Sequence, residues 1–280
     1  MNRRKFIKTS LLSTLGTGLF TGVYSWQIEP FWLEFVKRNM PVANLPEKLI
    51  GKTVMQISDI HIDHTGDYNY IIDAFKKAKK FKPDFVVYTG DYVTNRNKKQ
   101  FIFLKDVLQH AVFGKISTFG ILGNHDYGKA YKDKDFGLKI STILSERGIH
   151  VLSNAQIESD GLNFIGFDDY SGPNFNPELV MKNYDSSKAN IVLCHNPDVC
   201  DLDVWNGYQG WILSGHTHGG QCKPPLFDPP ILPVENKRYT QGEFDLYDGR
   251  KLYINRALGF VRQVRFNVRP EITIFKLEKA

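Results

Sequence analysis

Five short motifs rich in Asp, Asn and His could bind divalent metal ions. Carboxylate, amide and imidazole groups without thiolates form an oxygen and nitrogen ligand set, which favours Mn²⁺, Fe²⁺ or Zn²⁺ over a soft thiolate site. The motifs contain five of the eight histidines, and the other three, His64, His110 and His150, are expected to have ordinary surface or core roles. In chain order the motifs are Asp59-Ile60-His61, Gly90-Asp91, Gly123-Asn124-His125-Asp126, Cys194-His195 and Gly215-His216-Thr217-His218-Gly219-Gly220.

Each motif begins where a run of residues with strand character ends. Loops at the carboxyl ends of strands converge over a rigid sheet, so ligand sites of open α/β sheets assemble there. A Gly-Asp pair alone is usually a turn, and a single His after a strand is usually a hydrogen-bonded structural residue. Five such motifs in a fixed order nevertheless favour one shared site. The strand runs are 53–58, 85–89, 118–122, 190–194 and 210–214.

The spacing within two motifs adds a geometric expectation. In an extended segment, side chains two residues apart point to the same side. Asp59 and His61 are therefore expected to face one metal cluster, and so are His216 and His218. The flanking glycines allow the backbone to turn tightly beside the ions.

Helical patterns alternate with these strands in the first half of the chain. Apolar residues recur with helical spacing at 71–81, 101–111 and 136–144. Strands that alternate with helices indicate a βαβαβ layout.

The second half of the chain contains more strand patterns. Strands are predicted at 162–167 and 271–275, and hairpin turns at Asp160-Gly161 and Asp248-Gly249. Together with the first half, these patterns predict two sheets.

The segment 32–40 has two interpretations. Pro30 and Pro41 bracket it, which favours an edge strand. The alternative is an interfacial amphipathic helix with aromatic residues opposite Lys37 and Arg38.

Composition and charge narrow the class of protein. The chain has 280 residues, of which 42% are hydrophobic and 24% charged, as in soluble globular proteins, which excludes a disordered, collagenous or polytopic membrane protein. The net charge of +6 arises mostly from four basic residues near the amino terminus, because the other 32 basic residues face 30 acidic ones. This distribution argues against a nucleic-acid partner. The four residues are Arg3, Arg4, Lys5 and Lys8.

The amino terminus resembles a twin-arginine export signal. Its Arg pair, the following hydrophobic pair and Lys8 precede an uncharged stretch, 9–28, that is only weakly apolar. We expect residues 1–28 to engage the twin-arginine export machinery and residues 29–280 to form one folded domain in the periplasm or on the outer face of the cell membrane or cell wall. Retention through 9–28 as a membrane anchor stays open, and a basic tail before a buried helix is the alternative.

The three cysteines do not indicate a metal site. Their number is odd and they form no CxxC pair. Cys194 ends an apolar run and is expected to be a buried small hydrophobic residue, with a Cys194–Cys200 disulfide as the alternative.

Together, the five motifs resemble the calcineurin-like metallophosphoesterase superfamily, whose pattern is D-x-H, GD, GNHD or GNHE, H and GHTH. This resemblance spans Asp59 to Gly220. With the twin-arginine start, GHTHGGQ and the R-P-E-I strand at 269–272, nearly the whole chain is similar to the exported bacterial phosphodiesterase branch. The resemblance implies an α/β fold of the metallophosphoesterase type, a four-layer sandwich of two mixed β-sheets flanked by helices. It also implies a dinuclear metal site at one edge.

The resemblance further implies a role for each motif residue. Asp91 would bridge the two ions. His125 would bind neither ion and would act as the general acid, oriented by Asp126. The remaining ligands would be, for the first ion, Asp59, His61 and His218 and, for the second ion, Asn124, His195 and His216.

This arrangement suits the hydrolysis of phosphate esters. Two divalent ions are positively charged, whereas the carboxylates of Asp59 and Asp91 and a hydroxide are negative. Their charges add up to about +1, which attracts a phosphate. A hydroxide that bridges the ions, with Mn²⁺ favoured over Fe²⁺ and Zn²⁺, is expected to attack the phosphorus. His125 would then protonate the leaving alkoxide.

Three functions fit these residues. The first is a phosphodiesterase that hydrolyses a cell-envelope phospholipid or a nucleotide-linked pyrophosphate lipid or sugar. The alternatives are a phosphomonoesterase or protein phosphatase, and a noncatalytic metal-dependent scaffold on the same fold. The intact pair His125 and Asp126 favours an enzyme, since a scaffold needs no proton donor.

Substrate-binding residues stay open. The proline-rich, apolar segment 223–233 could receive an acyl chain or touch a membrane surface, the alternative being a packed, rigid loop. Other polar residues could reach a phosphate or sugar, or be solvated or ion-paired instead. These are Asp168, Asp169, Asn255, Arg256 and Arg262.

Overall fold

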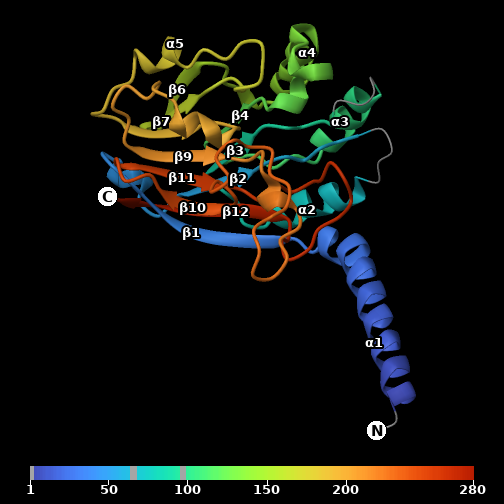
Figure 1. Ribbon diagram of the computed structural model, residues 1–280. Coiled ribbons are helices and arrows are strands. Elements are labelled where there is room, and N and C mark those ends of the chain that lie inside the picture. The colour runs from blue at the N-terminus through green and yellow to red at the C-terminus, as the bar shows by residue number, and fades with distance from the viewer. Residues whose placement is uncertain (1–2, 64–67, 95–98) are drawn as a thin grey trace.

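Two six-stranded mixed sheets packed face to face form the centre of the protein in the computed structural model, which describes residues 3–63, 68–94 and 99–280 (Figure 1). In the first sheet the neighbours from β2 to β5 are parallel, while β12 is antiparallel to β2 and parallel to β1. In spatial order its strands are β1 (Glu34–Val42), β12 (Glu271–Lys279), β2 (Thr53–Ile57), β3 (Phe85–Thr89), β4 (Ser117–Ile121) and β5 (His150–Val151).

The second sheet contains the strands between residues 155 and 254, from β6 to β11 in chain order. Its central strands are parallel, and an antiparallel hairpin closes each side. The hairpins turn at Asp160-Gly161 and Asp248-Gly249, which confirms both predicted turns. In spatial order its strands are β10 (Gly242–Asp245), β11 (Arg250–Ile254), β9 (Gly210–Ser214), β8 (Ala189–Leu193), β7 (Leu162–Gly166) and β6 (Ala155–Ser159).

Helices cover the outer faces of both sheets. On the first sheet, α2 (Asn69–Lys79), α3 (Gln100–Leu108) and α4 (Lys134–Glu146) share one buried apolar cluster with β2 and β3. On the second, α5 (Glu178–Met181) and the short 3-10 helix Pro197–Asp201 pack in the same way. The expected α/β four-layer sandwich and the βαβαβ layout are both confirmed.

Aromatic side chains fill the space between the two sheets. The Phe164 ring of the second sheet lies 5.4 Å from that of Phe85 and 4.6 Å from that of Phe119, centroid to centroid, and both partners belong to the first sheet. All three are fully buried. Burial of side chains of this size contributes about 1.5–3 kcal/mol each, so the two sheets form one rigid base for the loops at their edges.

The edge-strand interpretation of 32–40 is confirmed, with the strand shifted to Glu34–Val42. Pro41 lies inside β1 instead of bounding it. A proline is tolerated there because β1 is an edge strand whose other side needs no hydrogen-bond donor. The cysteines are free thiols, so the alternative Cys194–Cys200 disulfide is absent, and Cys194 is buried as expected. Cys200 is buried too.

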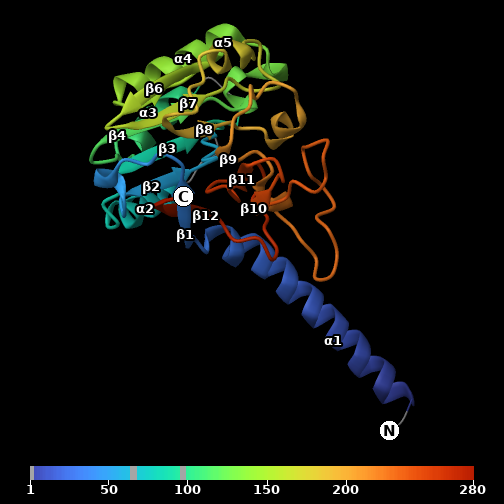
Figure 2. The same ribbon diagram turned by 90° about the vertical axis from the view of Figure 1, so that its left-hand side faces the viewer.

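The amino-terminal helix α1 (Arg3–Val23) projects away from the sheets (Figures 1 and 2). None of its residues is buried. Its carboxyl end is tied to the body, because the Ser25 carbonyl accepts the Arg265 N–H (2.9 Å) and the Glu29 carboxylate accepts the backbone N–H of Val268 (2.6 Å). Within the described ranges, no helix combines the length and the apolar character needed to cross a bilayer.

Candidate metal centre

All five motifs meet at one edge of the two sheets, where β2, β3, β4, β8 and β9 end. Backbone hydrogen bonds join the motif loops: Asp59 N–H donates to Gly90 O (3.0 Å) and Gly215 N–H to His195 O (3.1 Å). Two groups of ligand-type side chains result. Both groups are buried.

The first group consists of Asp59, His61 and His218. The His218 Nε2 atom lies 3.2 Å from Asp59 Oδ1 and 3.0 Å from His61 Nε2. Three ligand atoms this close, without an apolar side chain between them, can bind one small cation. These residues are the set expected for the first ion.

The second group consists of Asp91, His195 and His216. Asp91 Oδ2 lies 3.2 Å from His195 Nε2 and 3.7 Å from His61 Nε2, which belongs to the first group. One carboxylate oxygen is therefore within reach of ligands from both groups. This position is the one that a bridging ligand needs.

Hydrogen bonds leave one ring nitrogen free on each histidine of the second group. His195 Nδ1–H donates to Thr89 O (2.7 Å), so Nε2 is available. His216 Nε2–H donates to Pro233 O (2.8 Å), so Nδ1 is available. Such bonds fix the tautomer and the orientation of a metal-binding histidine.

Unpaired polar atoms at this place fit a pair of cations. Asn124 Oδ1, Asp91 Oδ2 and His195 Nε2 are buried and have no hydrogen-bond partner among the described residues. Buried polar atoms nearly always have a partner, and the exceptions often mark an ion site. Asn124 adjoins the second group, because the next residue, His125, donates its N–H to Asp91 Oδ1 (2.9 Å).

The electrostatics of the two groups favour added positive charge. Burial alone would raise the pKa of Asp59, but His218 outweighs it and lowers that pKa to about 2. Burial opposes charge on His195 too, yet the Asp91 carboxylate holds its pKa well above the usual range. Burial lowers the pKa of His216 to about 4, which keeps its ring neutral and able to coordinate an ion.

The backbone at the ligands is left-handed, so the expectation of extended D-x-H and H-x-H segments is wrong. L-residues rarely adopt positive φ, and each such residue costs on the order of 1–3 kcal/mol, a strain typical of functional sites. The turns send His218 to the first group and His216 to the second, so both still face the same cluster. The φ angles of Asp59, His61, Asp91, His216 and His218 are 52°, 47°, 56°, 69° and 53°.

Two glycines make room for these turns. A Cβ atom on Gly215 would lie 2.2 Å from Asp59 Oδ2, and one on Gly90 would lie 2.7 Å from His195 Nδ1. Neither distance is compatible with a side chain. Glycine is therefore required where the backbone passes directly behind a ligand.

His125 lies at the rim of the centre and belongs to neither ligand group. Its ring contacts His61 at 5.0 Å and Tyr131 at 5.3 Å, centroid to centroid. The ring is partly exposed, unlike the buried ligands. This position suits a group that meets a substrate from solvent.

The expected role of Asp126 needs correction, because its carboxylate binds backbone groups instead of the His125 ring. Oδ2 accepts the N–H of Asp91 (2.9 Å) and Gly123 (2.9 Å), and Oδ1 accepts that of Tyr92 (2.8 Å) and, at 3.3 Å, Val93. Asp126 thus joins the loops after β3 and β4 and positions the backbone of its neighbours.

Asp126→Ala is expected to lower the free energy of unfolding by about 3 kcal/mol or more, because four backbone donors lose a buried acceptor. Urea unfolding of the metal-free protein measures this change. Asp133→Ala is the matched control, since the Asp133 carboxylate accepts one N–H, that of Phe136 at the start of α4, and its loss should cost about 1 kcal/mol. Equal losses would contradict the role assigned to Asp126.

Two residues considered for substrate binding are structural. The Arg256 guanidinium bonds to Glu271 and to Glu34 (2.9 Å), and the Asn255 amide donates to Thr273 (2.9 Å). Paired in this way, neither faces the ligand groups as a free phosphate donor. Of the two interpretations left open for Arg256, the structure supports the ion-paired one, and Asn255 is likewise hydrogen-bonded within the fold; for Arg262 both interpretations stay open.

Asp168 and Asp169 differ in their surroundings. Asp168 accepts hydrogen bonds from the hydroxyls of Tyr127 (2.5 Å) and Ser153 and is structural. Asp169 is buried near the second group, and its Oδ2 has no hydrogen-bond partner among the described residues. Burial raises the pKa of Asp169 to about 7, despite the opposing effect of His195.

Sequence reasoning did not find the carbonyl acceptors of Thr89 and Pro233 or the Tyr131 ring beside His125. Every residue has a backbone carbonyl, so the residue type does not indicate which carbonyl accepts a hydrogen bond from a ligand. Of the three histidines outside the motifs, His150 is exposed, His110 is partly exposed, and His64 lies outside the described residues.

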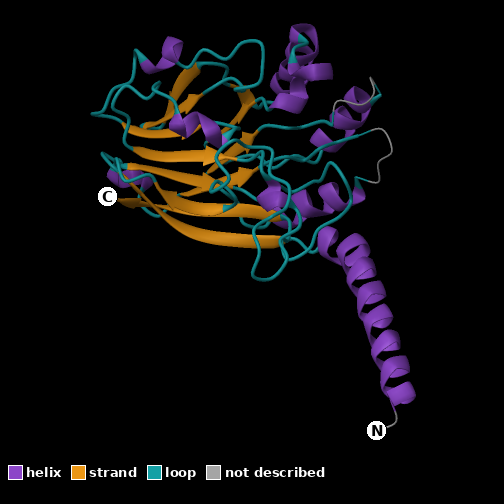
Figure 3. Cartoon of the chain, in the orientation of Figure 1, coloured by secondary structure: helices purple, strands orange, loops and turns teal. Residues whose placement is uncertain are grey.

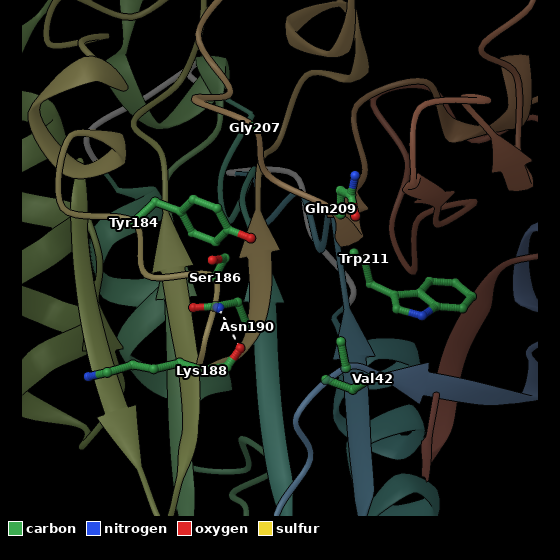
Figure 4. A pocket seen from close by; sticks show the side chains of 10 residues that line it. Val42, Tyr184, Ser186, Lys188, Asn190, Gly207, Gln209 and Trp211 are labelled. Atoms are coloured by element: carbon green, nitrogen blue, oxygen red, sulfur yellow. Dashed lines mark hydrogen bonds between the residues drawn. The ribbon is translucent and has the colours of Figure 1, made fainter.

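A small pocket lies at the opposite ends of the strands from the ligand groups (Figure 4). It is lined by residues near the start of β8 and β9, among them Asn190 and Trp211. The Asn190 amide donates to Lys188 O (2.8 Å) and Asp185 O (2.9 Å), so its donors are paired. No ligand residue lines this pocket, and it belongs to the scaffold.

Comparisons with known proteins agree with this geometry. The chain is 28% identical to UDP-2,3-diacylglucosamine pyrophosphatase LpxG of Chlamydia trachomatis over 96% of this chain and 97% of that protein. It is 30% identical to phosphodiesterase YaeI of Escherichia coli over 99% of both chains. It is 29% identical to the uncharacterised metallophosphoesterase YkuE of Bacillus subtilis over 99% of this chain and 98% of that one.

The calcineurin-like phosphoesterase family matches residues 52–220. That range includes all five motifs and both ligand groups. The chain therefore belongs to the calcineurin-like phosphoesterase family.

Proposed function

We propose that this protein is a phosphodiesterase with two divalent metal ions. Its substrate would be a cell-envelope phospholipid or a nucleotide-linked pyrophosphate lipid or sugar. The observation that carries the proposal is the position of Asp91 Oδ2, within 3.7 Å of histidine nitrogens from both groups. The names of two relatives, a phosphodiesterase and a pyrophosphatase of a diacylated sugar nucleotide, support a diester or pyrophosphate substrate.

In this proposal the seven ligands are Asp59, His61, Asp91, Asn124, His195, His216 and His218. Two divalent ions held by them would polarise the phosphate and make water nucleophilic near neutral pH. Oxygen and nitrogen ligands without sulfur suit Mn²⁺, Fe²⁺ or Zn²⁺, and of these we propose Mn²⁺.

Residues of the chain hold the Asp91 carboxylate in position and supply a proton to the leaving group. Asp91 is fixed through its Oδ1, which accepts the His125 N–H, and through its own N–H, which Asp126 binds. The partly exposed His125 ring lies beside His61 and can protonate the leaving oxygen of a substrate that enters from solvent.

With Mn²⁺ present, bis-p-nitrophenyl phosphate should be hydrolysed roughly tenfold or more faster than p-nitrophenyl phosphate, a difference of about 1.4 kcal/mol. A monoester carries one more negative charge than a diester. The net charge of about +1 at this centre can therefore neutralise the diester but not the monoester. The release of p-nitrophenolate measures both rates. A preference for the monoester favours a phosphatase, and no turnover by the fully metal-loaded protein favours a scaffold.

A screen of the protein against envelope lipid extracts and sugar nucleotides, with the products identified by mass spectrometry, would identify the class of the natural substrate.

We also propose that residues 1–28 direct export by the twin-arginine route, on the basis of the Arg3-Arg4 pair. Replacement of both arginines by lysine keeps the charge and removes the guanidinium groups. This variant is expected to accumulate in the cytoplasm, as measured by cell fractionation. Unchanged export of the variant would contradict the proposal.

A further inference from the structure

The loop between β9 and β10 exposes large apolar side chains beside the candidate metal centre. Leu226 is fully exposed, and Phe227 and Ile231 are 70% and 76% exposed. Most of this connection is loop (Figure 3). Adjacent exposed apolar side chains on a globular protein usually mark an interaction surface. We name these three residues the loop tip.

The base of this loop is anchored at the metal centre. Pro233 O accepts the His216 Nε2–H (2.8 Å), and Leu232 and Val234 are buried. Pro229 packs directly on Gly220, where a Cβ atom would lie 2.3 Å from the proline ring. Because prolines also restrict the backbone, the loop tip is held outward without a large cost in conformational entropy.

The same loop is connected to the base of α1. Lys223 N–H donates to Phe266 O (2.8 Å), and Phe266 N–H donates to Gln221 O (2.9 Å). The Phe266 ring contacts that of Tyr24, the residue that follows α1, with centroids 6.5 Å apart. The loop and α1 extend from the same side of the sheets (Figures 1 and 2).

Residues on this side of the protein are basic, aromatic or apolar, as suits contact with an anionic bilayer. Helix α1 has four basic residues and no acidic one. Trp26 and Trp32, at its base, are 56% and 50% exposed, and tryptophan is enriched where a protein meets the membrane–water interface. The exposed apolar residues of α1 are Phe6, Ile7, Leu11, Leu12, Leu15, Leu19, Phe20 and Val23.

We propose that the loop tip inserts into the surface of an anionic lipid bilayer and thereby positions the metal centre over lipid head groups. The anchored base makes this position specific, because the His216 ring is hydrogen-bonded to Pro233, which follows the loop tip closely in the chain. That the bilayer also contains the substrate rests on the proposed function. The docking itself does not require turnover.

The test is sedimentation of the purified full chain with vesicles of phosphatidylglycerol and phosphatidylethanolamine, without substrate. Replacing Leu226, Phe227 and Ile231 with Ser is expected to weaken vesicle binding at least about tenfold. These side chains are exposed, so the fold should tolerate the change. The matched control replaces Ile102, Leu138 and Leu179 with Ser. These are 62%, 67% and 51% exposed on α3, α4 and α5, away from the loop, and their replacement should leave binding unchanged.

A second measurement detects insertion directly. The Phe227→Trp variant is expected to gain fluorescence that brominated lipids quench, beyond the quenching of the wild-type tryptophans. Equal vesicle binding by the serine variant of the loop tip and the wild type would overturn the proposal, as would added fluorescence in Phe227→Trp that bromine does not quench. Self-association that disappears in the serine variant, without vesicle binding by the wild type, would also overturn it and assign the loop tip to a second copy of this chain. Because none of these readouts uses activity, failure of the proposed function would leave their result intact.

Discussion

The Asp91→Asn variant is expected to lose both metal ions together and, with them, phosphoesterase activity. Asp91 Oδ2 lies 3.2 Å from His195 Nε2 and 3.7 Å from His61 Nε2, between the two ligand groups. Asparagine keeps the shape but removes a negative charge that both ions would share. Mutation of a group that merely supports a ligand costs about 10–100-fold in metal affinity, so loss of a bridging ligand should cost more than about 100-fold for each ion.

Metal content after equilibration with Mn²⁺ measures this effect, with two ions per chain expected for the wild type. Asp59→Asn is the matched control, because Asp59 belongs to the first group alone and should affect mainly one ion. Circular dichroism of each metal-free variant verifies the fold. If Asp91→Asn keeps one ion at full affinity, Asp91 is not a bridge.

The His125→Ala variant is expected to retain both ions while kcat falls by roughly 10² to 10⁴, the usual contribution of a positioned general acid. His125 lies outside both ligand groups, and its partly exposed ring contacts His61 and Tyr131. The loss should be small for an aryl ester, because p-nitrophenolate leaves with little need of a proton. It should be large for an unactivated alkyl ester.

Metal content and kcat on both esters provide the readout, and His110→Ala, a histidine outside the motifs, is the control. A His125→Ala protein that lacks metal would identify His125 as a ligand. Equal losses on the two esters would show that His125 binds the phosphate or stabilises charge instead of donating a proton.

Local sequence patterns were sufficient to predict most elements of the fold. The run 85–89 became β3 with the same bounds, and the Asp160-Gly161 and Asp248-Gly249 pairs became the turns of two hairpins. These signals are local because a buried strand needs a continuous apolar run and a tight turn needs residues that tolerate positive φ. The pairing of strands is not local. β12, at the end of the chain, lies between β1 and β2, an order that depends on contacts between segments more than 200 residues apart.

The sequence by itself also determined which residue types gather at the strand ends, because Asp, Asn and His after buried runs have few structural uses in that pattern. Only the tertiary structure decided what each one does. Left-handed turns divide His216 and His218 between the two groups, and the packing of two loops gives Asp126 four backbone donors in place of the His125 ring. Ion pairing removes Arg256 from the candidates for substrate binding. The physical reason is the same in each case: a side chain's type sets the chemistry available to it, whereas its partner is set by backbone direction and by neighbours that are distant in sequence.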